Sequence, residues 1–171
     1  MSDSGKKTRV YIASDHAGYE LKNLLIPYIG NLQQKTQFDV IDMGPLVLDP
    51  EDDYPELIAP CAEKVAQNKD SLGIIIGSSG QGEAMVANRQ KGIRAAVFYG
   101  GAKAPHSFEE EGTSGTDLFD IVRATRLHND ANILSLGARF ISEEEAKEAV
   151  RIFLETAFSN AARHARRIAE F

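Results

Sequence analysis

The sequence predicts an α/β fold in which helices cover both faces of a parallel β-sheet. Apolar runs of strand length alternate with amphipathic, helix-like segments along the 171 residues, and this order is typical of parallel strands joined by crossover helices. In addition, the run at 72–76 is almost wholly apolar and lacks the alternation of a strand with one solvated face. It therefore predicts a strand buried on both faces, as parallel sheets require.

The same patterns place the individual elements. The expected strands are 9–14, 38–43, 72–76, 93–98 and 132–136, and the expected helices are 19–29, 54–68, a segment from 84 to 90, 142–157 and 160–171. Pro55 suits the first turn of a helix, and Ser142 with Glu145 forms a capping box. The stretch 99–116 is rich in glycine and acidic residues and predicts a long polar loop of the kind that is usually functional or disordered.

Composition narrows the class of protein. A length of 171 residues with 43% hydrophobic residues predicts one domain with a sizeable core. The net charge of −6 argues against a nucleic-acid partner, and no apolar run approaches the roughly 20 residues that span a bilayer. The single Cys61 excludes an internal disulfide framework. With no signal-peptide pattern after residues 1–7, which we expect to be flexible, the chain is predicted to be cytoplasmic with no membrane partner.

Residues 77–83, Gly-Ser-Ser-Gly-Gln-Gly-Glu, predict an anion-binding turn, since backbone N–H groups at a strand-to-helix junction point toward the ligand. The turn lacks the Gly-Lys-Ser/Thr of nucleotide hydrolases, and Met85 stands where the dinucleotide fingerprint needs Gly or Ala. Glu83 is unusual, because a carboxylate does not help to hold phosphate but suits a general base beside an enediolate. The alternative is a tight turn in which Glu83 is a favourable first-turn charge.

Other chemistry-bearing residues also follow strand ends. Asp15 and His16 follow the first strand, the loop around Tyr54 follows the second, and Arg139 follows the fifth. Ligands of open parallel sheets bind outside the carboxyl ends of the strands, so these residues and the glycine turn predict one binding rim. For Asp15 the alternative is a simple helix N-cap, with His16 incidental at the helix start.

Two further groups lie elsewhere in the sequence. His128-Asn129-Asp130 reads either as a polar turn or as the site of a proton-shuttling histidine. Arg163 and Arg167 are four residues apart and share a helix face, which suits a phosphate group or the carboxyl end of a helix. Cys61, on an apolar helix, predicts a buried structural thiol, and no Cys/His spacing indicates zinc.

Taken together, these segments resemble type B ribose-5-phosphate isomerases, in the superfamily that includes the galactose-6-phosphate isomerase subunits. The matching segments are Ser14-Asp15-His16-Ala17-Gly18, Asp53-Tyr54-Pro55, Gly80-Gln81-Gly82 with Ala87-Asn88, Gly92-Ile93-Arg94-Ala95, His128-Asn129-Asp130-Ala131-Asn132 and the terminal Arg163-His164 with Arg167. Each is weak alone, but six in order at similar spacing are specific. The resemblance covers almost the whole chain except 99–116.

The resemblance implies a Rossmann-like three-layer α/β/α fold with a five-stranded parallel sheet. It implies interconversion of ribose 5-phosphate and ribulose 5-phosphate through a cis-enediol, as in the pentose phosphate pathway, with neither a metal nor a nucleotide cofactor. It also implies a homodimer or a dimer of dimers, with the active site shared across an interface to which the C-terminal helix, 158–171, contributes.

The resemblance further assigns roles to residues. Glu83 is the general base, and Gly77 stands where some members carry a cysteine base instead. His128 is the acid that opens the sugar ring, and His16, Arg163 and Arg167 hold the phosphate. The full set of implied substrate contacts is Asp15, His16, Tyr54, Ser78, Ser79, Gly80, Gln81, Gly82, Asn129, Arg139, Arg163 and Arg167.

Three points stay open at this level. The segment 99–116 is longer than in the shorter members, so we expect it to alter substrate preference or oligomer contacts, and the same chemistry on allose or galactose 6-phosphate is an alternative. A non-catalytic sugar-phosphate binding protein is another. Finally, a helix N-terminus lowers the pKa of a carboxyl such as Glu83 whereas burial raises it, and the sequence does not decide the balance.

Overall fold

The computed structural model describes residues 7–32, 37–103 and 116–171. Within them, five strands form one sheet in the order β2-β1-β3-β5-β4, and every neighbouring pair is parallel. The strands are β1 (Thr8–Ser14), β2 (Phe38–Asp42), β3 (Leu72–Gly77), β4 (Ala95–Phe98) and β5 (Ile133–Gly137). The predicted parallel α/β fold is therefore confirmed.

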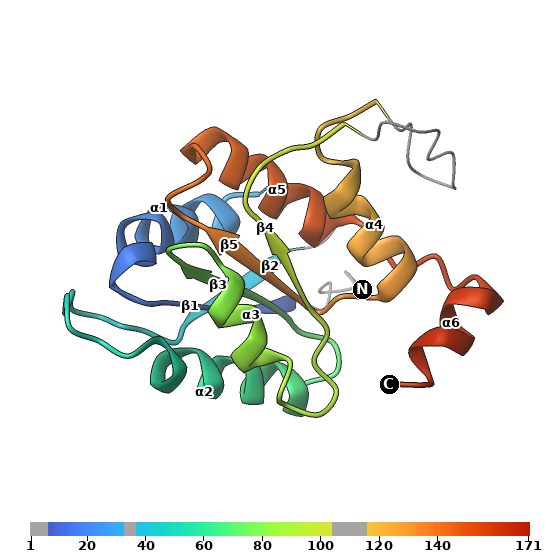
Figure 1. Ribbon diagram of the computed structural model, residues 1–171, viewed down its shortest axis with the longest axis horizontal. Coiled ribbons are helices and arrows are strands. Elements are labelled where there is room, and N and C mark those ends of the chain that lie inside the picture. Colours follow the sequence, from blue (N-terminus) through green and yellow to red (C-terminus); the bar gives the residue numbers. More distant parts are fainter. Residues whose placement is uncertain (1–6, 33–36, 104–115) are drawn as a thin grey trace, which may run out of the picture.

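Helices cover the sheet on both faces (Figure 1). The helices of the described residues are the 3₁₀ turn η1 (His16–Gly18), α1 (Tyr19–Gly30), α2 (Tyr54–Gln67), α3 (Gln81–Ala87), α4 (Asp120–Asn129), α5 (Glu143–Glu155) and α6 (Ala162–Ile168), of which α6 lies outside the layers. Helices α1, α4 and α5 share one buried apolar cluster with the sheet, and α2 and α3 share the other. The sheet therefore lies between two layers of helices, which is the expected α/β/α architecture.

The two clusters arise because successive strand residues point to opposite faces. In β1, Val10 and Ile12 face the α1 side, and Tyr11 and Ala13 face the α2 side. Cys61 of α2 is fully buried in the second cluster, and burial raises the pKa of its thiol to about 12. The prediction of a structural thiol at this position is confirmed.

Element ends follow local chemistry. The predicted capping box opens α5, where the Glu145 backbone N–H donates to Ser142 Oγ at 3.2 Å and the Ser142 N–H donates to Glu145 Oε2 at 2.9 Å. Strand β4 begins at Ala95 rather than 93, because the Arg94 N–H donates to the Asn132 side chain instead of the sheet. Helix α6 is shorter than predicted.

One helix was missed. No element was predicted between the long loop and the fifth strand, and a polar turn was one of the two interpretations of 128–130. In the structure His128 and Asn129 form the last turn of α4, and only Asp130 leaves the helix, with a left-handed φ of 44°. Of the two interpretations, the polar turn is therefore wrong for His128 and Asn129, which are carried on a helix.

The predicted loop 99–116 connects β4 to α4, and the structure describes only its ends. There the Ala102 N–H donates to the Leu118 carbonyl at 3.1 Å. The acidic run 109–111 and the N-terminal residues 1–6, which were expected to be flexible, lie outside the described residues. None of the helices that are described is long and apolar enough to cross a membrane.

Candidate active site

The carboxyl ends of β1, β3 and β5 meet at one rim of the sheet. Here the Asp15 N–H donates to the Ile76 carbonyl at 3.1 Å, and the Arg139 N–H donates to the Ser78 carbonyl at 3.1 Å. Arg139 also acts electrostatically on His16. The structure thus brings together Asp15, His16, the turn 78–82, Glu83 and Arg139, as the rim prediction expects. We call this set, with Tyr54, the carboxyl rim.

The glycine turn at this rim is rigidly held. Gly80 has a φ of 74°, and a Cβ there would lie 3.0 Å from the Leu136 carbonyl carbon, so only glycine fits without strain. Its carbonyl accepts hydrogen bonds from Ser135 Oγ at 2.6 Å and from the Ala84 N–H at 3.1 Å. These contacts fix the direction in which α3 begins, with Glu83 in its first turn.

The Glu83 side chain turns inward beneath the end of β3. The residue is only 4% exposed, and a Cβ added to Gly77 would lie 2.0 Å from Glu83 Oε1. The carboxyl therefore occupies the space that any side chain at position 77 would need. In this chain an inward-facing glutamate at 83 therefore requires a glycine at 77.

Burial decides the protonation balance of this carboxyl. Loss of solvent raises the pKa of Glu83, while hydrogen bonds from the backbone N–H groups of Glu83 and Gly80 oppose that rise and the nearby Asp15 carboxylate adds to it. The net direction is upward, which answers the question that the sequence left open. A carboxylate with a raised pKa is a stronger base once it has lost its proton.

Asp15 and His16 are held in different ways. Asp15 is 6% exposed, and its Oδ1 accepts the Gly18 N–H at 3.0 Å, so it does cap the following turn. His16 is held by Asp52, whose Oδ1 lies 2.7 Å from the ring Nδ1 and 3.2 Å from the backbone nitrogen. Asp52 was not among the predicted site residues.

Tyr54 closes the rim from the side of α2. A Cβ at Gly82 would lie 2.8 Å from the Tyr54 hydroxyl oxygen, so the hydroxyl rests against the backbone at the start of α3. Ser79 Oγ accepts the Gln81 N–H at 3.4 Å, and the Gln81 side chain is exposed. The turn therefore presents backbone and small polar groups between Tyr54 and His16.

A second group of predicted residues lies on α4 and α6. The rings of His128 and His164 are stacked, with centroids 4.6 Å apart, and Arg163 Nε donates to His164 Nε2 at 3.3 Å. Arg163 and Arg167 are both exposed and stand one helical turn apart. Figure 1 shows α6 standing out beyond α4. We call His128, Asn129, Arg163 and Arg167 the α4–α6 group.

The α4–α6 group and the carboxyl rim lie at opposite edges of the sheet. Helix α4 passes through Asp130 into the amino end of β5, whereas Glu83 follows the carboxyl end of β3, a parallel neighbour of β5. Since β3 has 6 residues, the two edges are on the order of 20 Å apart at about 3.3 Å per residue. One chain therefore does not bring His128 to Glu83.

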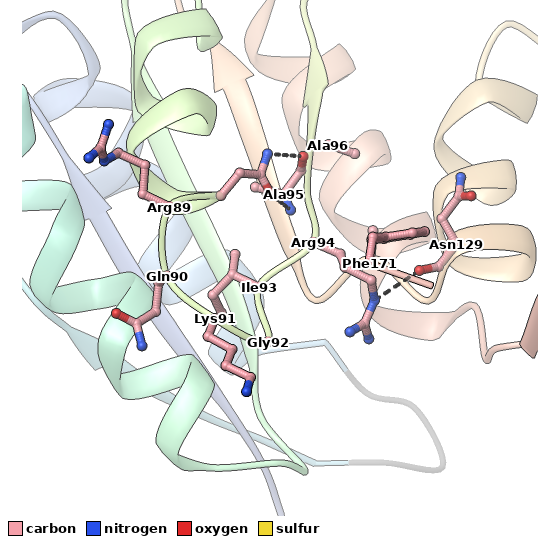
Figure 2. A pocket seen from close by; sticks show the side chains of 12 residues that line it. Arg89, Gln90, Lys91, Gly92, Ile93, Arg94, Ala95, Ala96, Asn129 and Phe171 are labelled. Atoms are coloured by element: carbon pink, nitrogen blue, oxygen red, sulfur yellow. Dashed lines mark hydrogen bonds between the residues drawn. The ribbon is translucent and has the colours of Figure 1, made fainter. Parts of the chain in front are cut away.

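A groove of about 710 Å³ opens at the amino edge, beside Asn129. It lies between the end of α3, the start of β4 and Phe171, and it contains the basic side chains Arg89, Lys91 and Arg94. Figure 2 shows Arg94 reaching the Asn129 carbonyl, with a distance of 3.0 Å from its Nε. Glu83 does not line this groove, so the groove is separate from the carboxyl rim.

Comparison with known proteins assigns the chain to a family. The model of the ribose/galactose isomerase family matches residues 10–112 and 118–171. The chain belongs to this family. The match is interrupted only at 113–117, within the long loop, and it includes both the carboxyl rim and the α4–α6 group.

Individual relatives agree with the family. Probable ribose-5-phosphate isomerase B of Mycoplasma pneumoniae is 40% identical over 159 residues, covering 93% of this chain and 90% of the relative. Ribose-5-phosphate isomerase B of Mycobacterium tuberculosis is 35% identical over 160 residues, covering 94% and 85%. The Mycoplasma genitalium isomerase B structure with bound ribulose-5-phosphate has a TM-score of 0.79 at 34% identity, covering 95% of this chain and 93% of that one.

Proposed function

We propose that this protein interconverts ribose 5-phosphate and ribulose 5-phosphate, with Glu83 as the base. The family and the names of its relatives support an isomerase, and a similar structure holds ribulose-5-phosphate. The observation that carries the proposal is the Glu83 carboxyl, buried beneath Gly77 at the carboxyl rim with its pKa raised.

The proposed chemistry needs one proton moved between adjacent carbons. Glu83 removes the proton from C2 of the aldose, which leaves a cis-enediolate with its charge on O1, and then returns that proton to C1. The ketose is complete when O1 takes up a proton and the C2 hydroxyl gives one up, so one proton moves from C2 to C1 and one from O2 to O1. Negative charge develops on the substrate oxygen meanwhile. Backbone N–H groups of the turn 78–82 stabilise it, because their positions are fixed before the reaction begins.

The phosphate end of the substrate lies by this proposal near His16 and Arg139, two cationic groups at the carboxyl rim. Asp15, Tyr54, Ser78, Ser79 and Gln81 line the space for the sugar hydroxyls. Each of these residues is at the rim through the backbone contacts described above.

The α4–α6 group completes the site from a second copy of the chain, in a homodimer or a dimer of dimers. Support comes from the geometry, since the two groups lie at opposite edges of one chain's sheet. By this proposal His128 of the second copy opens the sugar ring, Asn129 positions it, and Arg163 and Arg167 bind the phosphate as paired guanidinium groups.

The decisive experiment measures turnover of ribose 5-phosphate by the wild type, by Glu83→Gln and by Glu144→Gln. Glu144 is an exposed first-turn glutamate on α5 and serves as the matched control. We expect Glu83→Gln to lose roughly 10²–10⁴-fold in kcat, the usual contribution of a general base, and to keep competitive inhibition by phosphate.

Near-normal turnover by Glu83→Gln would show that Glu83 is not the general base. Allose 6-phosphate and galactose 6-phosphate are run in parallel with the wild type, and faster turnover of either would replace the pentose by a hexose phosphate. Binding of ribose 5-phosphate without turnover of any of these substrates would show that the protein is a non-catalytic sugar-phosphate binding protein.

A further inference from the structure

Asp52 is a mostly buried carboxylate that lies against a proposed substrate-binding residue and has no assigned role. It stands in the loop between β2 and α2, where its backbone N–H donates to the Asp49 carbonyl at 3.2 Å. Its side chain is 10% exposed, beside a His16 side chain that is 34% exposed. The turn at 49–52 therefore delivers a carboxylate to the inner side of the His16 ring.

One oxygen of Asp52 takes both N–H groups of His16. Asp52 Oδ1 lies 3.2 Å from the His16 backbone nitrogen and 2.7 Å from the ring Nδ1. An ionised carboxylate only accepts hydrogen bonds, so Nδ1 must carry its proton. This fixes both the orientation and the tautomer of the ring, and it directs Nε2 away from Asp52, on the more exposed side of the pair.

We infer that Asp52 is a positioning residue that holds His16 so that Nε2–H of a cationic ring donates to the phosphate of the substrate. Asp52 itself does not touch the substrate in this arrangement. The inference rests on the proposed function, because it places the phosphate group at His16.

The charges around His16 agree with this role. The hydrogen bond that His16 donates to Asp52 is the largest influence and raises the pKa of His16, with further help from the negative charges of Asp15 and Asp52, while partial burial and the positive Arg139 oppose it. The net direction is upward, so the ring keeps its positive charge to a higher pH than a free histidine. Asp52 Oδ2 is buried and has no hydrogen-bond partner among the described residues.

The test compares Asp52→Asn with Glu51→Gln. Asparagine keeps the shape and a carbonyl acceptor for His16 but removes the charge. Glu51 is its exposed neighbour, so Glu51→Gln removes the same charge one residue away.

The first two readouts are the His16 ring pKa, by NMR titration, and the KM for ribose 5-phosphate between pH 5.5 and 8.5. Asp52→Asn should lower the pKa of His16 and raise KM roughly tenfold at pH 8, as expected for loss of a charge-assisted hydrogen bond. The KM ratio to wild type should shrink toward pH 5.5, where the ring is protonated in both proteins. The kcat should change little, and Glu51→Gln should match the wild type.

A third readout separates positioning from a general structural role. In a His16→Gln background, adding Asp52→Asn should have no further effect on KM, because the residue through which Asp52 acts is gone. A full tenfold loss in that background, or an unchanged His16 pKa in Asp52→Asn, would overturn the inference. If the wild type lacks pentose isomerase activity, the proposed function fails, and inhibition constants for inorganic phosphate on its actual substrate decide the role of Asp52 separately.

Discussion

The carboxyl rim and the α4–α6 group carry the same kinds of residue but are built differently. The rim is formed by strand ends: β1, β3 and β5 deliver Asp15, Gly77 and Arg139 to one edge, and backbone hydrogen bonds between these segments fix it. The α4–α6 group instead stands on two helices at the other edge, held by the stacked rings of His128 and His164.

Under the proposed function, this difference separates the half of the site that one chain assembles from the half that a second copy would supply. Parallel strands must end at the same edge of a sheet, so residues that follow them are neighbours by topology. Residues on helix surfaces carry no such constraint within the chain. We propose that they form one half of a symmetric interface, in which each copy would give its α4–α6 group to the other copy's rim.

Mixing two inactive variants is the strongest test of whether the carboxyl rim of one chain works with the α4–α6 group of another. Chains with Glu83→Gln are co-refolded with chains with His128→Asn, and turnover of ribose 5-phosphate is measured. If the sites are shared, each hybrid dimer has one intact site, so activity should return to about a quarter of wild type for random pairing of two subunits.

The matched control mixes Glu83→Gln with Gly77→Ala, two changes in the same half of the site. Every site of that mixture keeps one defect, so it should stay inactive. No activity in the first mixture would show that each chain holds its own complete site, whereas restored activity in the control would show that Glu83 and Gly77 do not belong to the same half of the site.

Gly77→Ala tests whether Glu83 needs the space beneath residue 77. The new methyl group would lie 2.0 Å from Glu83 Oε1, so the carboxylate has to leave its place. We expect kcat to fall about 100-fold, the effect of a displacement of about 1 Å at a reacting group. Gly30→Ala is the control, since a Cβ there meets nothing within 4 Å, and both variants should show wild-type circular dichroism.

The raised pKa of Glu83 gives a smaller, pH-dependent effect on stability. Because the folded protein binds this proton more tightly than the unfolded chain, the stabilisation is full at acidic pH and is lost as pH rises through the folded-state pKa. Glu83→Gln should therefore melt roughly 2–4 °C above wild type at pH 8, and the difference should vanish at acidic pH. A calorimetric pH series measures this, and equal melting temperatures throughout would refute a buried, charged Glu83.

The sequence predicted the sheet and the rim because both depend on local pattern. Buried strands read as apolar runs, and the residues directly after them are neighbours by topology, so Asp15, Glu83 and Arg139 were assigned to one edge correctly. Helix α4 was missed because most of its residues are polar or charged, although its few apolar residues do lie on one face. The long run from 117 to 131 without glycine or proline was the available signal.

The sequence alone thus determined the fold class, the family and the carboxyl rim, since alternation and motif order need no knowledge of distant contacts. The tertiary structure decided three things: the upward pKa shift of Glu83, which depends on burial beneath Gly77; the link from Asp52 to His16, residues 36 positions apart; and the placement of His128 at the opposite edge. Each depends on which segments pack together, and packing is a property of the folded chain rather than of any local stretch of sequence.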